Sequence, residues 1–118
     1  MKNIEIKRVY ENPSPTDGVR ILVDRLWPRG IKKNELIMDD WIKDLSPSTD
    51  LRKWFNHDPS KFKEFGKKYI EELDDTRKIW FPLIKKYLSK KITLLYAAHD
   101  QEINHAICLK NYLEKHLP

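Results

Sequence analysis

Residues 24–30 of this sequence, Asp-Arg-Leu-Trp-Pro-Arg-Gly, bring together side chains that are suited to bind a small anion. Arg25 and Arg29 offer planar sets of hydrogen-bond donors that match a carboxylate or a phosphate. Trp27, between them, offers a flat face for a base or a sugar ring. Farther along the chain, His105 is suited to act as a general acid or base near neutral pH.

Three further residues complete the candidate site. Arg52 follows a turn-forming segment and can either hold an anion or pair with a nearby acid such as Asp44. Tyr96 stands near the end of an apolar run and is a second candidate for stacking. Asn104 can orient a ligand through its side-chain amide. These residues would hold, stack and orient the ligand, with the histidine beside it.

Structural roles are the alternative for the same side chains. Asp24 and Arg25 can pair with each other or across the fold, and Trp27 can fill part of the core, as tryptophans commonly do. His105 can be a satisfied structural histidine at the edge of a buried helix face. The sequence leaves both alternatives open.

The other histidines and the cysteine form no catalytic or metal-binding pattern. His57 and His99 each precede an aspartate, but adjacent side chains do not normally face each other, and neither histidine is assigned a role. Cys108 is the only cysteine and is predicted to be a small buried hydrophobe, so no internal disulfide is expected. No H-x-x-x-H or C-x-x-C spacing and no Gly-rich phosphate loop occurs, so we predict neither a metal site nor a cofactor.

Two apolar runs of strand length, residues 19–23 and 92–98, lead directly into the candidate segments. In open α/β sheets, ligands bind outside the carboxyl ends of the strands. If the two strands are parallel and close together, residues 24–30 and 99–105 line one crevice. The predicted site therefore lies at the carboxyl ends of two strands.

The remaining pattern predicts a small α/β fold. Residues 4–9 favour a first short strand, and residues 31–45 favour a brief helical turn followed by a strand near 39–44. Apolar spacing then predicts a short helix through Phe55, two helices with faces between residues 62 and 73 and between 80 and 88, and a last helix capped by Asp100. We expect a short, mostly parallel sheet with helices packed on it, Rossmann-like without the Gly-rich fingerprint.

Length and composition indicate a single domain over residues 1–118. The chain is 40% hydrophobic and 35% charged, which is typical of a globular protein with one core. No apolar run approaches the roughly 20 residues of a membrane span, and the N-terminal segment lacks a signal-peptide core. We expect a cytoplasmic protein that does not enter the membrane, and the sequence leaves its oligomeric state open.

The positive charge of the chain supports a second hypothesis, binding to nucleic acid. The formal net charge is +5, and residues 76–91 contain six Lys or Arg and no acid. The alternative for this run is a solvated helix face with a basic end that complements the helix dipole. Acidic residues at 71–75 interrupt the basic surface, to which further lysines would contribute: Lys32, Lys33, Lys61, Lys63, Lys67 and Lys68. A third hypothesis is a protein-interaction module with an exposed apolar patch.

Four segments resemble the YeaO-like family, small bacterial proteins classed as a domain of unknown function. They are residues 24–30, 47–52, 93–96 and 104–106, and the similarity runs from residue 7 to residue 113. The first segment, DRLWPRG, is long and unusual enough to be specific. The resemblance implies a single compact α/β domain and no established activity. His99 and Asp100 are less typical of the pattern, which speaks against a catalytic role for them.

The sequence thus predicts a pocket for a small anionic ligand, a nucleotide or a sugar phosphate, at the carboxyl ends of the strands. If the protein is an enzyme, the simplest chemistry is hydrolysis or group transfer with His105 as acid or base. No nucleophile and no carboxylate for activating water identifies itself, so we predict no reaction. Whether there is turnover stays open.

Overall fold

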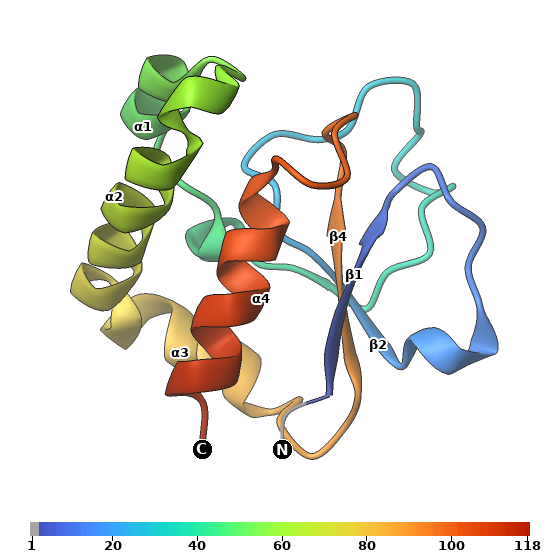
Figure 1. The fold of residues 1–118 in the computed structure, drawn as a ribbon. Coiled ribbons are helices and arrows are strands. Elements are labelled where there is room, and N and C mark those ends of the chain that lie inside the picture. Colours follow the sequence, from blue (N-terminus) through green and yellow to red (C-terminus); the bar gives the residue numbers. More distant parts are fainter. Residues whose placement is uncertain (1–2) are drawn as a thin grey trace.

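The computed structural model describes residues 3–118, in which four strands form one sheet (Figure 1). The strands are β1 (Ile4–Arg8), β2 (Val19–Leu22), β3 (Asp40–Trp41) and β4 (Ile92–Tyr96). They stand in the order β1-β4-β2-β3, and all three pairings are parallel. The predicted α/β class and parallel sheet are confirmed.

Strand β4 lies inside the sheet because its residues, Ile-Thr-Leu-Leu-Tyr, carry no charge and are all buried. Leu94 aligns with Ile6 of β1 on one side and with Ile21 of β2 on the other. A strand that is buried on both faces is expected to be continuously apolar. Its position brings the carboxyl ends of β2 and β4 side by side.

Residues 3–118 also contain four α-helices. They are α1 (Thr49–Phe55), α2 (Phe62–Asp75), α3 (Arg77–Lys85) and α4 (His105–His116). Short 3-10 turns cover Pro15–Asp17, Lys43–Leu45 and Pro59–Lys61. Ser48 caps α1 by accepting from the Leu51 N–H. Within residues 3–118, none of these helices has the length and apolar character needed to cross a membrane.

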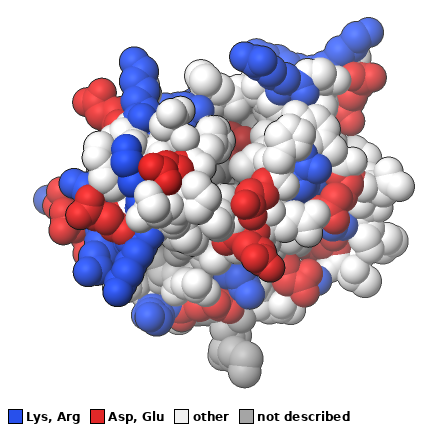
Figure 2. All heavy atoms as spheres, turned by 45° about the horizontal axis from the view of Figure 1, so that its top comes forward, with Lys and Arg blue, Asp and Glu red and all other residues white. Residues whose placement is uncertain are grey.

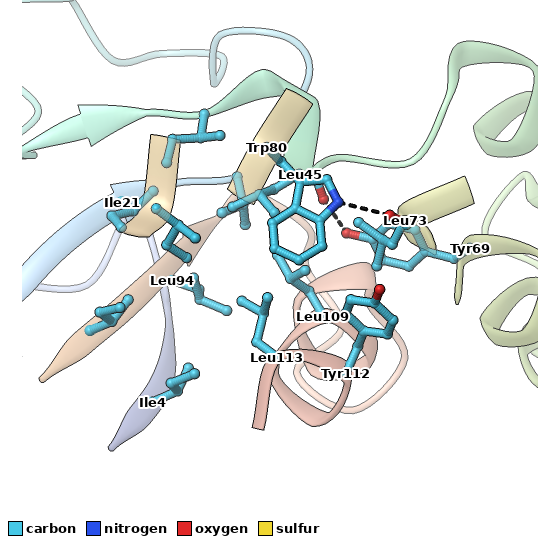
Figure 3. Packing of buried hydrophobic residues seen from close by; sticks show 14 of the residues in the cluster. Ile4, Ile21, Leu45, Tyr69, Leu73, Trp80, Leu94, Leu109, Tyr112 and Leu113 are labelled. Carbon is cyan, nitrogen blue, oxygen red and sulfur yellow. Dashed lines mark hydrogen bonds between the residues drawn. The ribbon is translucent and has the colours of Figure 1, made fainter. Parts of the chain in front are cut away.

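The main core lies between the sheet and the helices. Strand residues such as Ile21 and Leu94 face side chains of α2, α3 and α4. Figure 3 shows Trp80 donating its indole N–H to the Leu73 carbonyl at 2.8 Å, and Tyr69 donating to the carbonyl of Leu45. The polar atoms of both large rings are therefore satisfied inside the core.

The opposite face of the sheet is covered by a loop instead of helices. Leu22 and Leu95 point to this face and form a smaller cluster with Val9. Residues of the long connection between β2 and β3, including Trp27, pack against this cluster, and Trp41 of β3 joins them. A Rossmann fold places helices on both faces. Here the helices cover one face only, so the segment that carries the candidate arginines also serves as a cover for the sheet.

Three local predictions need correction. Asp100 does not cap the last helix: it accepts from the N–H groups of Glu102 and Ile103, and the helix begins later, with Asn104 as its N-cap. The strand predicted near 39–44 is only two residues long and continues into a 3-10 turn. No helical turn precedes it, since residues 33–35 form a simple turn. The sequence does not distinguish Asn104 from Asp100 as the cap, because Asn and Asp are equally favourable at that position.

Candidate functional site

A groove lies at the carboxyl ends of β2 and β4, between the segments that follow these strands. It has two compartments, with volumes of about 550 Å³ and about 400 Å³. The two compartments are lined in common by six residues: Leu26, Pro47, Arg52, His57, Ala98 and His105. They are therefore two halves of one groove, and each has a volume in the range of small-molecule sites.

The larger half, which we call the cationic compartment, is rich in arginine and histidine. Asp24 is the only carboxylate that lines it. The basic residues that line it are Arg25, Arg29, Arg52, His57, His99 and His105. Two neutral rings, Tyr10 and Trp27, complete its polar edge. This half of the groove therefore presents an excess of positive charge.

Arg25 is held by the chain that leads into α1. Its Nε donates to the Pro47 carbonyl at 3.1 Å, and its terminal nitrogen Nη2 lies 3.4 Å from the Ser46 carbonyl. These contacts tie the exit of β2 to the residues before α1, which form the wall between the two compartments. Arg25 thus shapes the groove, and only part of its guanidinium is left for a ligand.

Arg29 and Arg52 are exposed and uncommitted. Within residues 3–118, neither guanidinium has a hydrogen bond or an ion pair. The backbone carbonyl of Arg29 accepts from the Tyr10 hydroxyl at 2.9 Å, which fixes the position of its turn. Both guanidinium groups are therefore available to a bound anion.

His105, the first residue of α4, is anchored through one ring nitrogen. Its Nε2 lies 3.1 Å from the Val23 carbonyl and 3.1 Å from Asp24 Oδ1. Since a carbonyl only accepts, Nε2 carries the proton, and Nδ1 is the nitrogen left for a ligand. Asp24 Oδ2 accepts from the Ala97 N–H at 3.0 Å, whereas Oδ1 is buried without a hydrogen bond of its own among residues 3–118. The Asp24 Oδ1 contact with His105 is therefore electrostatic rather than a directed hydrogen bond.

The other sequence-predicted residues lie at the groove to different degrees. Trp27 reaches the cationic compartment, but its indole donates to the Ile31 carbonyl at 2.6 Å and its ring packs edge-on against Trp41. Asn104 lines the smaller half, but its amide is used to cap α4 and to donate to Asp100 O. Tyr96 is buried and lines neither half. The structure thus brings five of the seven predicted side chains to the cationic compartment and leaves out Asn104 and Tyr96.

The smaller half, which we call the apolar compartment, was missed by the sequence analysis. It is lined by no carboxylate, and six of its thirteen lining residues are apolar: Leu26, Pro47, Phe55, Phe65, Ala98 and Ile103. The others are polar or basic, with Arg52 and Lys53 among them. Asn56 and His57, at the end of α1, also line it and both have positive φ angles of 45° and 56°. Consecutive non-glycine residues in this region are uncommon and are often held at functional sites. An Asn at a helix C-terminus is a weak sequence signal for such a turn.

The chain is similar in sequence to a known family. A family model described as the inactive DUF488-N3 subclade matches residues 3–118. The chain belongs to this subclade. It is 43% identical over 111 residues to "Uncharacterized protein YeaO" of Escherichia coli (strain K12), covering 94% of this chain and 96% of that protein. It is 48% identical over 73 residues to "Uncharacterized protein Rv3073c" of Mycobacterium tuberculosis (strain H37Rv), 62% of each chain. No solved structure matches it significantly.

The family assignment confirms the resemblance that the sequence motifs indicate, and the motifs converge in the structure. Residues 24–30, 47–52 and 104–106 are far apart in the sequence but all contribute to the groove. The fourth segment, residues 93–96, lies in β4 and supports them from within the sheet. In this member of the DUF488-N3 subclade, the segments that carry the resemblance therefore surround one cavity.

The basic run at 76–91 lines a hollow of about 590 Å³ at the start of α3, but two carboxylates, Asp74 and Asp75, line it together with Arg77 and Lys78. Arg77 lies over the rings of Trp80 and Phe81, with its guanidinium carbon 4.6 Å from the Phe81 ring centre. Lys91 pairs with Glu5 at 3.1 Å. Figure 2, which turns the carboxyl end of the sheet forward, shows Lys and Arg interspersed with Asp and Glu. On this face, the charges do not form one continuous basic surface.

Residues 3–118 contain potential metal ligands and one cysteine. Among residues 3–118, no three His, Cys, Asp or Glu side chains are placed to hold a metal ion. Cys108 is partly buried beside Gly66, and burial raises the pKa of its thiol to about 11. A thiol with so high a pKa is a poor nucleophile at neutral pH.

Proposed function

We propose that this protein binds a small organic anion in the groove, with nucleotides and sugar phosphates as the first candidates. The observation that carries this proposal is the charge of the cationic compartment, where three arginines face a cavity of about 550 Å³ lined by a single carboxylate. Two of these arginines, Arg29 and Arg52, lack ionic partners within residues 3–118. A bound anion would supply the missing negative charge.

The surroundings of the arginines favour specific binding over loose ion attraction. The turn that carries Arg29 is fixed by the Tyr10 hydroxyl, and the wall beside Arg52 is fixed by Arg25. A site that is already ordered loses less conformational entropy when it binds. Guanidinium groups also contact carboxylates and phosphates through two parallel hydrogen bonds, which adds geometric selectivity.

Binding without turnover agrees best with the site. No serine, threonine or cysteine in the groove is paired with a base, since His105 Nε2 is held by the Val23 carbonyl. The family description, an inactive subclade, supports the same view. In this proposal, His105 keeps its proton on Nε2, and its Nδ1 accepts from a hydroxyl or N–H donor of the ligand instead of moving a proton during a reaction.

Thermal-shift screening followed by calorimetry tests the proposal. Nucleotides, sugar phosphates, inorganic phosphate and small carboxylates would be compared at low and moderate salt. A ligand at about 100 times its Kd stabilises the folded state by about 2.7 kcal/mol, which shifts the Tm of a domain of this size by several degrees. We expect such a shift for at least one anion and its loss in the double variant Arg29→Ala/Arg52→Ala.

The matched control is the double variant Lys90→Ala/Lys115→Ala. It removes the same charge from exposed positions near the amino ends of the strands, away from the groove. Equal loss of binding in both double variants would show that overall charge, not the groove, attracts the anion. A silent small-molecule screen together with salt-sensitive retention of DNA or RNA would refute the pocket in favour of the nucleic-acid hypothesis.

A further inference from the structure

The apolar compartment lies directly beside the cationic one. The residues shared by the two halves form the boundary, and Arg52, His57 and His105 are among them. A ligand whose anion contacts Arg52 therefore has its next atoms at the entrance of the apolar half. The side chains that line the apolar compartment therefore indicate which group is attached to the anion.

Two stacked aromatic side chains are among the residues that line the apolar compartment. The rings of Phe55 and Phe65 stack with their centres 4.4 Å apart and their planes at 24°. Ile103, from the turn before α4, contributes a further apolar side chain. Phe55 and Phe65 are largely buried, so the apolar surface open to a ligand comes mainly from the residues around them. Such a surface gains free energy from contact with another apolar group.

Leu26 adds an exposed apolar group at the rim. It lines both halves of the groove and is 64% exposed, the highest value among the large hydrophobic side chains that are exposed in residues 3–118. Leu26 belongs to neither of the two core clusters of residues 3–118. An apolar group bound in the compartment would remove part of its surface from water.

We infer that the ligand is an amphiphilic anion in which an apolar group, aromatic or short alkyl, is bonded directly to the charged phosphate or carboxylate. This inference rests on the proposed function, binding of a small organic anion in the groove. It specifies the part of the ligand that is not the anion, and it places amphiphilic anions ahead of nucleotides and sugar phosphates as candidates. A simple sugar phosphate has no group that suits the apolar half. In a nucleotide, a polar ribose separates the base from the phosphate, so the group next to the anion is polar rather than apolar.

Matched pairs of small probes test the inference by calorimetry. Phenyl phosphate is compared with glycerol 1-phosphate and inorganic phosphate, and benzoate with acetate, which separates the two kinds of anion. We expect the aryl member of at least one series to bind about tenfold more tightly, since burying much of a phenyl ring corresponds to roughly that factor. Leu26→Ser should reduce the affinity for the aryl anion several-fold and leave that for the simple anion unchanged.

The control is Ile79→Ser, which removes a comparably exposed apolar side chain (54%) from α3, outside the groove. It should leave every affinity unchanged. If aryl and simple anions bind equally, and Leu26→Ser changes neither, the inference is overturned while the anion site stands. If none of these probes binds but a nucleotide or a sugar phosphate does, the inference fails and the proposed function stands. If no anion of either set binds, both fail. Because Leu26 is exposed, its replacement is not expected to prevent folding.

Discussion

Two charged clusters in this molecule use the same residue types in opposite ways. On the loop-covered face of the sheet, the buried carboxylate of Asp17 contacts Arg20 at 2.5 Å and Lys7 at 2.8 Å. At the carboxyl end of the sheet, Arg29 and Arg52 stand in an open groove with no such partner among residues 3–118. In the first cluster the positive charges are paired with a carboxylate of the chain itself. In the second, the guanidinium donors have no such partner among residues 3–118.

The difference follows from solvent access. A buried charge must be paired, because the cost of removing it from water is otherwise too large. Arg20, which is buried, also donates its Nε to the Ile37 carbonyl at 2.7 Å, so its donors are used within the fold. Exposed arginines meet no such requirement, and their donors can be kept for a ligand. Residues that serve stability and residues that serve binding should therefore respond differently to substitution.

The largest effect is expected for Asp17→Asn. The variant keeps the shape of the side chain but leaves the charges of Arg20 and Lys7 without their carboxylate. Breaking a buried ion pair by removing one partner typically costs about 3–5 kcal/mol. Urea unfolding followed by tryptophan fluorescence measures this loss. Glu114→Gln, on the exposed end of α4, is the control, and a similar small loss in both variants would contradict the role given to Asp17.

A pH titration weakens the same cluster reversibly. Burial raises the pKa of Asp17, but hydrogen bonds from Lys7, the Ser14 backbone and Arg20 outweigh it and lower the pKa from 3.8 to about 2. The carboxylate therefore stabilises the fold above about pH 4, and this contribution is lost as the pH falls toward 2. The free energy of unfolding should fall less steeply over this range in Asp17→Asn than in the natural chain. Parallel curves would exclude Asp17 as a source of acid sensitivity.

Much of the fold could be predicted from the sequence because its signals are local. An uncharged apolar run such as residues 92–96 has few alternatives to a buried strand, and apolar spacing of three and four marks the faces of α2 and α4. Prediction failed where two neighbouring residues compete for one role, as with Asp100 and Asn104 at the start of α4. The length of strand β3 was also predicted wrongly. Only two of its residues pair with β2, and the local sequence does not show where this pairing ends.

The candidate site was only partly predictable, for a related reason. The rule that ligands bind at the carboxyl ends of strands located residues 24–30 and His105 correctly beside one groove. The apolar compartment could not be foreseen, because Phe55 and Phe65 have the helical spacing of ordinary core residues. Tyr96 was assigned to the site because it lies near the end of a strand, but its side chain is buried and lines neither compartment.

A smaller loss is expected for Arg25→Ala, since this arginine belongs to both kinds of region. It lines the cationic compartment, but it also donates to the carbonyls of Pro47 and Ser46. Because the side chain is only partly buried and one contact is long, we expect a loss of about 1 kcal/mol in unfolding free energy. Arg25→Lys should not recover it, because an ammonium group cannot reproduce the two-carbonyl contact. Full stability of Arg25→Ala would show that the wall before α1 is held by other contacts.

The smallest change in stability is expected for Arg52→Ala, which distinguishes the two regions most directly. Because Arg52 is exposed and lacks an ionic partner within residues 3–118, its removal should alter the free energy of unfolding by less than about 0.5 kcal/mol. Removing one of several neighbouring positive charges also relieves repulsion in the cationic compartment, so a slight gain in stability is within this range. The same variant should nevertheless lose affinity for anions in calorimetry. A loss of stability above 1 kcal/mol with unchanged anion affinity would place Arg52 with the structural arginines and remove it from the site.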